Sequence, residues 1–77
     1  MPRITPVSWK TLECIFQKAG FVFNRQEGDH RAYLRQGTVR PIIIPTYKEV
    51  DIEIIRSNMR TAKMSREEYF RLLADCK

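Results

Sequence analysis

His30 is the only histidine in the chain, and histidine is the side chain best suited to proton transfer near neutral pH. It follows Gly28 and Asp29, a pair typical of a tight turn, and it precedes a run with the two-residue alternation of a strand. Cleavage of RNA needs a base for the ribose 2'-hydroxyl and an acid for the leaving oxygen, and His30 could serve in this chemistry. On spacing alone, a solvated surface histidine at a turn is the commoner alternative.

The acidic neighbours of His30 leave two readings open. Asp29 could orient the imidazole, but an aspartate after a glycine more often satisfies the turn itself. Glu27 could join as a second acid or base only if the turn brings both side chains to one face of the sheet. Cys14 is disfavoured as a nucleophile because the sequence places no base beside it. His30 is therefore the predicted catalytic residue.

Basic side chains recur along the chain, and the formal net charge of +5 favours an anionic partner. In a strand, Arg31 and Arg35 share a face with Tyr33, which suits phosphate contacts beside a ring that stacks on an unpaired base. The alternative is that solvent-facing strand positions are charged whatever the function. The predicted RNA contacts come from Lys10, Arg25, Arg31, Tyr33, Arg35 and Lys48.

The elements that must position these residues begin with a helix over about residues 9–19. Ser8 is a good N-cap, and Gly20 supplies the left-handed position that ends a helix. Two strands follow, over residues 21–27 and 31–35, joined at Gly28 and Asp29 as a hairpin. The first part of the chain is thus a helix followed by a hairpin.

The second part of the chain continues with a β-branched run over residues 39–44, a third strand. Because Pro41 cannot donate to a ladder, this strand is expected at an edge. Helical spacing returns after Asp51, and a capping box at Ser65 opens a last helical turn or two. The expected fold is a single α+β domain over residues 1–77, in the order α-β-β-β-α with a short extra C-terminal helix. Its three-stranded antiparallel sheet carries the helices on one face.

Composition and motifs exclude several function classes. No apolar run approaches the roughly 18 residues that span a bilayer, so we expect no membrane partner and a cytoplasmic location. Cys14 and Cys76 lack the spacing of a zinc site and the cysteine density of a secreted mini-protein, which predicts two free thiols in a reducing cytosol. No phosphate-cradling glycine loop is present, and we expect neither a cofactor nor a metal ion.

The most specific pattern is the series of arginine, glutamine, glycine and histidine through the hairpin. It is joined to a preceding helix that is followed directly by Gly-Phe. Each part alone is weak, but the whole series is hard to reproduce by chance in so short a chain. With these residues the chain resembles the HicA family of mRNA interferases over about residues 7–73. The matching positions are Ser8, Lys10, Lys18, Ala19, Gly20, Phe21, Arg25, Gln26, Gly28, His30, Pro45, Arg56, Ser57, Ala62, Met64, Ser65 and Glu67.

This resemblance implies a fold like the double-stranded RNA-binding domain and a translation-independent, metal-independent mRNA endonuclease. It assigns the catalytic role to His30. It also implies a HicB-type antitoxin as partner, which covers the active site, with DNA bound only indirectly through the antitoxin. The toxin would then be silent in the complex.

Two of the positions that depart from the family's usual pattern bear on activity. Asp29 stands where the family most often has serine, and Tyr47 stands where it has a histidine two residues after the strand-ending proline. A carboxylate beside the imidazole repels phosphate while favouring the imidazolium. The departures keep open the alternative of a non-catalytic RNA-binding module of the same fold. The apolar edge strand at residues 42–44 keeps open a second alternative, a protein-binding domain that uses this strand.

Overall fold

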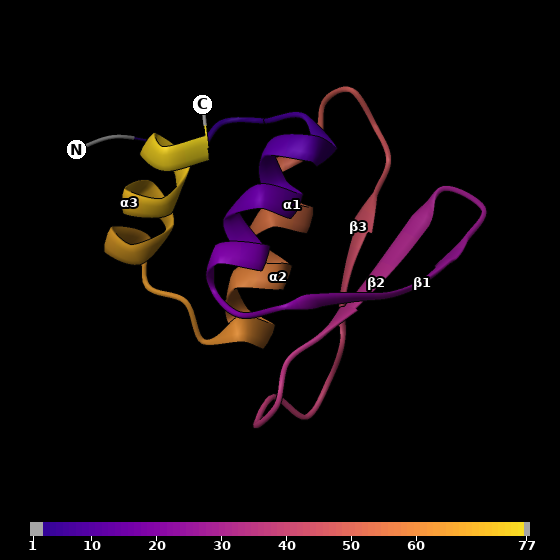
Figure 1. Ribbon diagram of the computed structural model, residues 1–77. Helices are drawn as coiled ribbons and strands as arrows, with labels where there is room; N and C mark the ends of the chain where they lie inside the picture. Colours follow the sequence, from indigo (N-terminus) through magenta and orange to yellow (C-terminus); the bar gives the residue numbers. More distant parts are fainter. Residues whose placement is uncertain (1–2, 77) are drawn as a thin grey trace.

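The computed structural model describes residues 3–76, and its elements follow the order α-β-β-β-α-α (Figure 1). The three strands form one antiparallel sheet in the order β1-β2-β3, and the helices lie together on one side of it. The predicted α+β class and antiparallel sheet are confirmed. The bounds are α1 Trp9–Lys18, β1 Val22–Glu27, β2 His30–Leu34, β3 Ile42–Pro45, α2 Ile52–Ala62 and α3 Arg66–Cys76.

The ends of α1 follow from its local sequence. The Ser8 side chain accepts a hydrogen bond from the Thr11 backbone N–H at 3.3 Å, which satisfies one of the free donors of the first turn. After the last turn Gly20 adopts a φ of +102°, a conformation that a side chain disfavours. At the start of α2, by contrast, Asp51 occupies the N-cap position without a capping hydrogen bond from its side chain.

The β1–β2 hairpin closes through the two residues between Glu27 and His30, which are paired across the ladder. Gly28 has a φ of +57°, as the first position of a type II′ turn requires. A bulge lies between Phe23 and Arg25, since Phe23 pairs with Tyr33 whereas Arg25 pairs with the next residue of β2, Ala32. Paired residues share a face, so the bulge places Phe23 on the helix side of the sheet and Arg25 on the open side.

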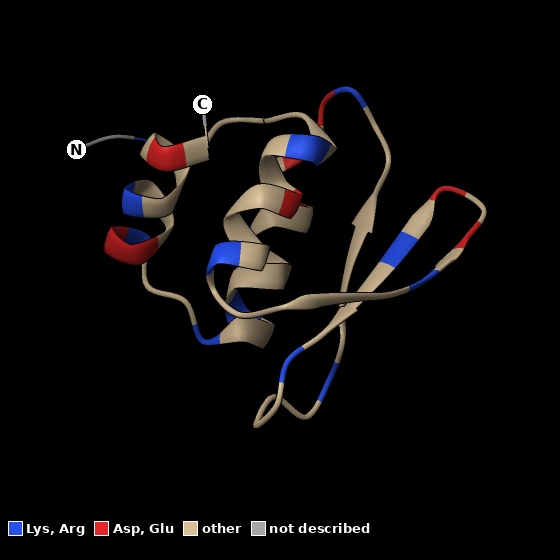
Figure 2. Ribbon diagram, in the orientation of Figure 1, with Lys and Arg blue, Asp and Glu red and all other residues tan. Residues whose placement is uncertain are grey.

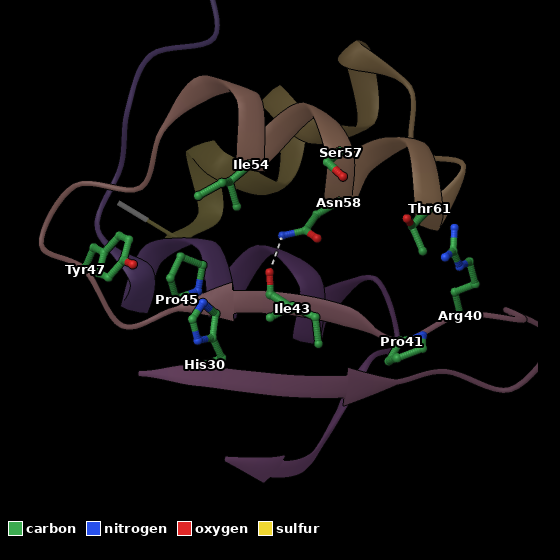
Figure 3. Close-up of a pocket in the computed structure, with 10 residues that line it drawn as sticks. All are labelled: His30, Arg40, Pro41, Ile43, Pro45, Tyr47, Ile54, Ser57, Asn58 and Thr61. Carbon is green, nitrogen blue, oxygen red and sulfur yellow. Dashed lines mark hydrogen bonds between the residues drawn. The ribbon is translucent and has the colours of Figure 1, made fainter. Parts of the chain in front are cut away.

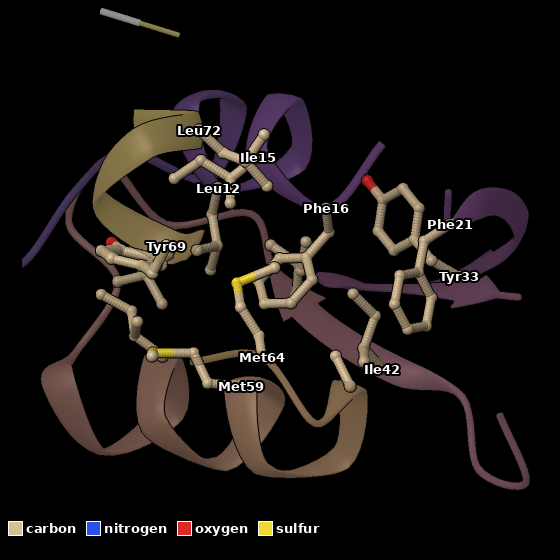
Figure 4. Close-up of a cluster of buried hydrophobic side chains, with 14 of the residues drawn as sticks. Leu12, Ile15, Phe16, Phe21, Tyr33, Ile42, Met59, Met64, Tyr69 and Leu72 are labelled. Carbon is tan, nitrogen blue, oxygen red and sulfur yellow. The ribbon is translucent and has the colours of Figure 1, made fainter. Parts of the chain in front are cut away.

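The hydrophobic core lies between the helices and the helix side of the sheet (Figure 4). Phe16 and Phe21 contact edge to face at a centroid distance of 5.8 Å, while Trp9 is only partly buried at its margin. Phe23, although it lies on the helix side of β1, is 40% exposed. The largest fully buried side chains are Tyr33, Tyr69, Phe16, Phe21, Leu12, Ile15, Ile42, Ile44, Ile55 and Val50.

In the C-terminal part of the chain the expected last helix is confirmed, although it is longer than predicted, whereas the prediction about the cysteines was wrong. The last helix, α3, is 11 residues long rather than a turn or two, and it packs along α1. It brings Cys76 to a Cα–Cα distance of 5.9 Å from Cys14, with which it forms a disulfide, so these residues are not free thiols. The two cysteines are 62 residues apart in sequence, and only the packing of α3 on α1 brings them together.

Within residues 3–76, no helix combines the length and apolar character that crossing a membrane demands.

Candidate functional site

A groove of about 490 Å³ runs between α2 and the edge of the sheet formed by β3 (Figure 3). His30 and Tyr47 lie at one end of it, and Arg40 lies at the other. Its volume falls within the range of roughly 300–1,000 Å³ that small-ligand sites occupy. The lining residues are His30, Arg40, Pro41, Ile43, Pro45, Tyr47, Ile54, Ser57, Asn58 and Thr61.

His30 is the first residue of β2, and its side chain is exposed at the end of the groove. Two backbone hydrogen bonds fix its surroundings. The Thr46 N–H donates to the Asp29 carbonyl at 2.7 Å, which ties the hairpin turn to the end of β3. The Trp9 N–H donates to the Tyr47 carbonyl at 3.1 Å, which ties the next loop to α1. The imidazole is thus accessible, while the backbone that carries it is held from two sides.

Glu27 lies directly opposite His30 in the β1–β2 ladder, so the two side chains share the open face of the sheet. The turn therefore brings Glu27 and His30 to one face of the sheet, which the sequence alone left open. Glu27 also forms an ion pair with Arg25 at 3.4 Å, with both side chains largely exposed. Such a pair contributes little to stability, and both groups stay available to solvent and ligands.

Arg31, by contrast, points to the helix side of the sheet and is held by protein groups. Its guanidinium donates to the Tyr33 hydroxyl at 2.9 Å and to the Glu13 carboxylate at 3.1 Å, and it lies 4.1 Å from the Phe23 ring centroid. The hydrogen bond with Tyr33 is the main cause that raises the pKa of Arg31, with Glu13 adding to it. Arg31 therefore joins β2 to α1 and keeps its charge compensated.

Tyr33 and Arg35 are likewise occupied within the fold. Tyr33 has no exposed surface and donates its hydroxyl proton to Glu13, so its expected stacking on a base is not compatible with this geometry. Arg35 donates to the Ala19 carbonyl at 3.0 Å and to the Ala62 carbonyl at 2.8 Å. The shared face that the alternation predicted does exist, but it is the face that packs against the helices.

A comparison with protein families bears on what such a groove does. The family model described as the HicA toxin of bacterial toxin-antitoxin systems matches residues 9–64, more than half of the 77-residue chain. The chain belongs to the HicA toxin family. No curated protein matches it. The matched region of this HicA-family toxin contains α1, the sheet and α2, and therefore every residue that lines the groove.

In this HicA-family toxin, Lys10 and Lys48 are exposed near the His30 end of the groove. Lys10 follows Trp9 and Lys48 follows Tyr47, and Trp9 and Tyr47 are joined by a backbone hydrogen bond of 3.1 Å. The two lysines thus extend from one junction between α1 and the β3–α2 loop. Together with Arg25 on the open face, they are the members of the predicted RNA-binding set whose charges face solvent.

The structure adds groove residues that the sequence did not single out for RNA contact. Ser57, Asn58 and Thr61 project from α2 beside Ile54, at helical spacings of three and four residues, and Arg40 precedes β3. A polar stripe on an otherwise amphipathic helix was the available signal, but polar helix positions usually face water. Only the packing of α2 beside β3 turns this stripe towards a cavity.

Across the region that the structure describes, no group of three or more His, Cys, Asp or Glu residues is placed to hold a metal ion.

Proposed function

We propose that this HicA-family toxin is an mRNA endoribonuclease in which His30 transfers the proton, and that a HicB-type antitoxin neutralises it. The main support for this proposal is that the exposed imidazole of His30 lies at the end of a groove, in a chain that belongs to a toxin family. The Glu27 and Arg25 side chains share the open face with it, and Lys10 and Lys48 extend near the same end. The cations among these groups, Arg25, Lys10 and Lys48, support phosphate binding beside a proton acceptor.

In the proposed reaction the neutral imidazole of His30 removes the proton of a ribose 2'-hydroxyl. The 2'-oxygen attacks the adjacent phosphorus, the bond from phosphorus to the 5'-oxygen breaks, and the 5'-oxygen takes up a proton from solvent. The imidazolium then returns its proton to solvent, so that protons and charge balance. The products are a 2',3'-cyclic phosphate end and a 5'-hydroxyl end, and nearby cations offset the charge that builds up on the phosphate.

The test compares wild type with His30→Ala in cleavage of a purified mRNA in the presence of EDTA. Removing a general acid or base lowers the rate about 10²- to 10⁴-fold, so the variant should cleave at least a hundred times more slowly. Induction in cells should arrest growth for wild type alone. Arg60→Gln, a change on α2 outside the groove, is the control and should cleave like wild type.

Equal cleavage by wild type and His30→Ala would show that the assignment of His30 is wrong. RNA binding without cleavage by wild type would favour the RNA-binding alternative, and Asp29 and Tyr47 are the residues to exchange first in that case. The alternative of β-strand addition at β3 has weaker support, because the Asn58 amide already donates to the Ile43 carbonyl at this edge at 3.0 Å.

A further inference from the structure

We propose that the groove between α2 and β3 is a nucleotide subsite for single-stranded RNA, in which Asn58 contacts a base edge and Arg40 holds a neighbouring phosphate. The inference rests on the proposed function, since it places RNA in the groove, and it names a site beyond His30. Asn58, Arg40, Ser57 and Thr61 would determine which nucleotide lies beside the cleaved bond.

Asn58 is the buried polar residue of α2, with only 6% of its surface exposed. Its Nδ2 donates to the Ile43 carbonyl at 3.0 Å, and this fixes the amide orientation because a carbonyl needs a donor. The Oδ1 atom accepts no hydrogen bond from any residue within 3–76, and it is not among the side-chain atoms sealed from solvent there. A buried amide with an open acceptor on a cavity wall is suited to a ligand N–H.

The rest of the groove wall combines apolar surface with a few polar groups. Pro41, Ile43 and Pro45 line the sheet side, and Ile54 lines the helix side (Figure 3). The hydroxyls of Ser57 and Thr61 flank Asn58 along α2. Apolar walls with a small number of placed polar groups are typical of sites that bind a flat ring and read its edge.

Arg40 supplies the charge at the end of the groove away from His30 (Figure 3). It makes no hydrogen bond or ion pair with the part of the chain that the structure describes, unlike Arg31 and Arg35, whose guanidiniums are held by protein oxygens. The lining residues include no Asp or Glu. The uncompensated guanidinium therefore favours an anion, and phosphate matches its geometry.

These features together select the chemistry of the occupant. A base edge with an N–H fits the Asn58 acceptor, and the phosphate of the same strand fits Arg40. In a duplex that edge is already paired with the opposite strand, so an unpaired nucleotide is required. The subsite should therefore prefer single-stranded RNA over double-stranded RNA.

Binding is measured first, with labelled single-stranded RNA in the His30→Ala background so that the probe stays intact. Each phosphate contact on a single strand contributes about 0.7 to the slope of log K against log salt. Arg40→Gln should lower this slope by about 0.7 and weaken binding about fivefold at low salt, the scale of one exposed ionic contact. Arg60→Gln, from the exposed part of α2, is the matched control and should change neither by as much.

Base selection is measured second, from the nucleotides flanking the cut sites of a random single-stranded RNA pool. Wild type should show a preference at one flanking position, and Asn58→Ala should remove it. Because Asn58→Ala also loses the bond to Ile43, the double variant Ser57→Ala with Thr61→Val, which leaves that bond intact, should weaken the same preference. A circular dichroism melt checks that each variant is folded.

Three results would overturn the subsite. The first is an equal salt slope for Arg40→Gln and Arg60→Gln, the second is an unchanged flanking preference in the folded double variant, and the third is equal affinity for duplex and single strand. The first and third results are binding measurements in the His30→Ala background and need no cleavage, whereas the second needs a toxin that cleaves. A toxin that cleaves through His30 but gives these results would refute the subsite alone, whereas His30-independent cleavage would refute the proposed function alone.

Discussion

Glu13, Arg31 and Tyr33 form a polar cluster that connects α1 to the central strand. The Tyr33 hydroxyl donates to Glu13 and accepts from Arg31, so all three side chains depend on one another. Burial is the main cause that raises the pKa of Tyr33 to about 12, and the hydrogen bond to Glu13 adds to it. The folded protein thus favours the neutral phenol more strongly than the unfolded chain does.

A pH dependence at alkaline pH follows from this pKa. In the unfolded chain a tyrosine ionises near pH 10, whereas Tyr33 in the folded protein ionises near pH 12. The contribution to the free energy of unfolding is fully present below pH 10 and is lost as the pH rises from about 10 to 12. Thermal melts between pH 8 and 12 should show this loss, and Tyr33→Phe should show a smaller one.

Burial also raises the pKa of Tyr69, and Tyr69 is still present in the Tyr33→Phe variant. The loss of stability at alkaline pH should therefore be smaller in this variant but not absent. At pH 7 the free energy of unfolding of the Tyr33→Phe variant should be about 1–2 kcal/mol lower than that of wild type, because two hydrogen bonds of the cluster lose their partner. Its RNA cleavage should match wild type. A large loss of cleavage with unchanged stability would return Tyr33 to the RNA-binding set.

At the scale of elements, Arg35 at the end of β2 joins the ends of two helices. Its guanidinium donates to the carbonyl of Ala19, which directly follows α1, and to the carbonyl of Ala62, the last residue of α2. It also lies 4.4 Å from the Phe21 ring centroid. A cation at a helix C-terminus also opposes the negative end of the helix dipole. One side chain therefore sets the position of both helices relative to the sheet.

The variant Arg35→Lys tests this role. Lysine keeps the charge but cannot donate in two fixed directions, so we expect a loss of about 2 kcal/mol in the free energy of unfolding, measured by urea titration. Arg25→Lys, an exposed arginine of the same sheet, should change it by less than about 0.5 kcal/mol. Equal effects of the two substitutions would mean that the helix contacts of Arg35 contribute little.

Elements with local signals could be predicted from the sequence. The helix expected over residues 9–19 is found at Trp9–Lys18, because Ser8 and Gly20 act on the backbone beside them. The bulge at Asn24 could not be predicted, because no residue type marks it and it depends on which side chains pack on Tyr33. The same limit explains the groove, since Asn58 gains its role only from the neighbouring strand.

At the scale of the whole molecule, basic charge does not gather on one element, as Figure 2 shows. Lys and Arg occur on all three helices and in the connections between strands. Arg31 and Arg35 serve the fold, while Arg40, Lys10 and Lys48 face solvent near the groove. Net charge alone therefore overestimates how many cations are available to RNA.

The disulfide between Cys14 and Cys76 should be a large single contribution to stability. In the chain-entropy model, a crosslink closing a loop of this size stabilises the fold by about 4 kcal/mol, because it restricts the unfolded chain. Cys76→Ser, or reduction of the wild type, should therefore lower the urea midpoint substantially. A midpoint that does not move on reduction would show that the packing of α3 on α1 is sufficient without the bond.

The same bond has a consequence for a chain that has been cut. Val39, in the loop between β2 and β3, is 98% exposed, which makes this loop a favourable place for a protease. A single cut there separates α1, β1 and β2 from β3, α2 and α3, but Cys14 belongs to one fragment and Cys76 to the other. The nicked protein would run near its intact mass on a gel without reductant and near half of that mass with it, because a cut at Val39 leaves two fragments of almost equal length.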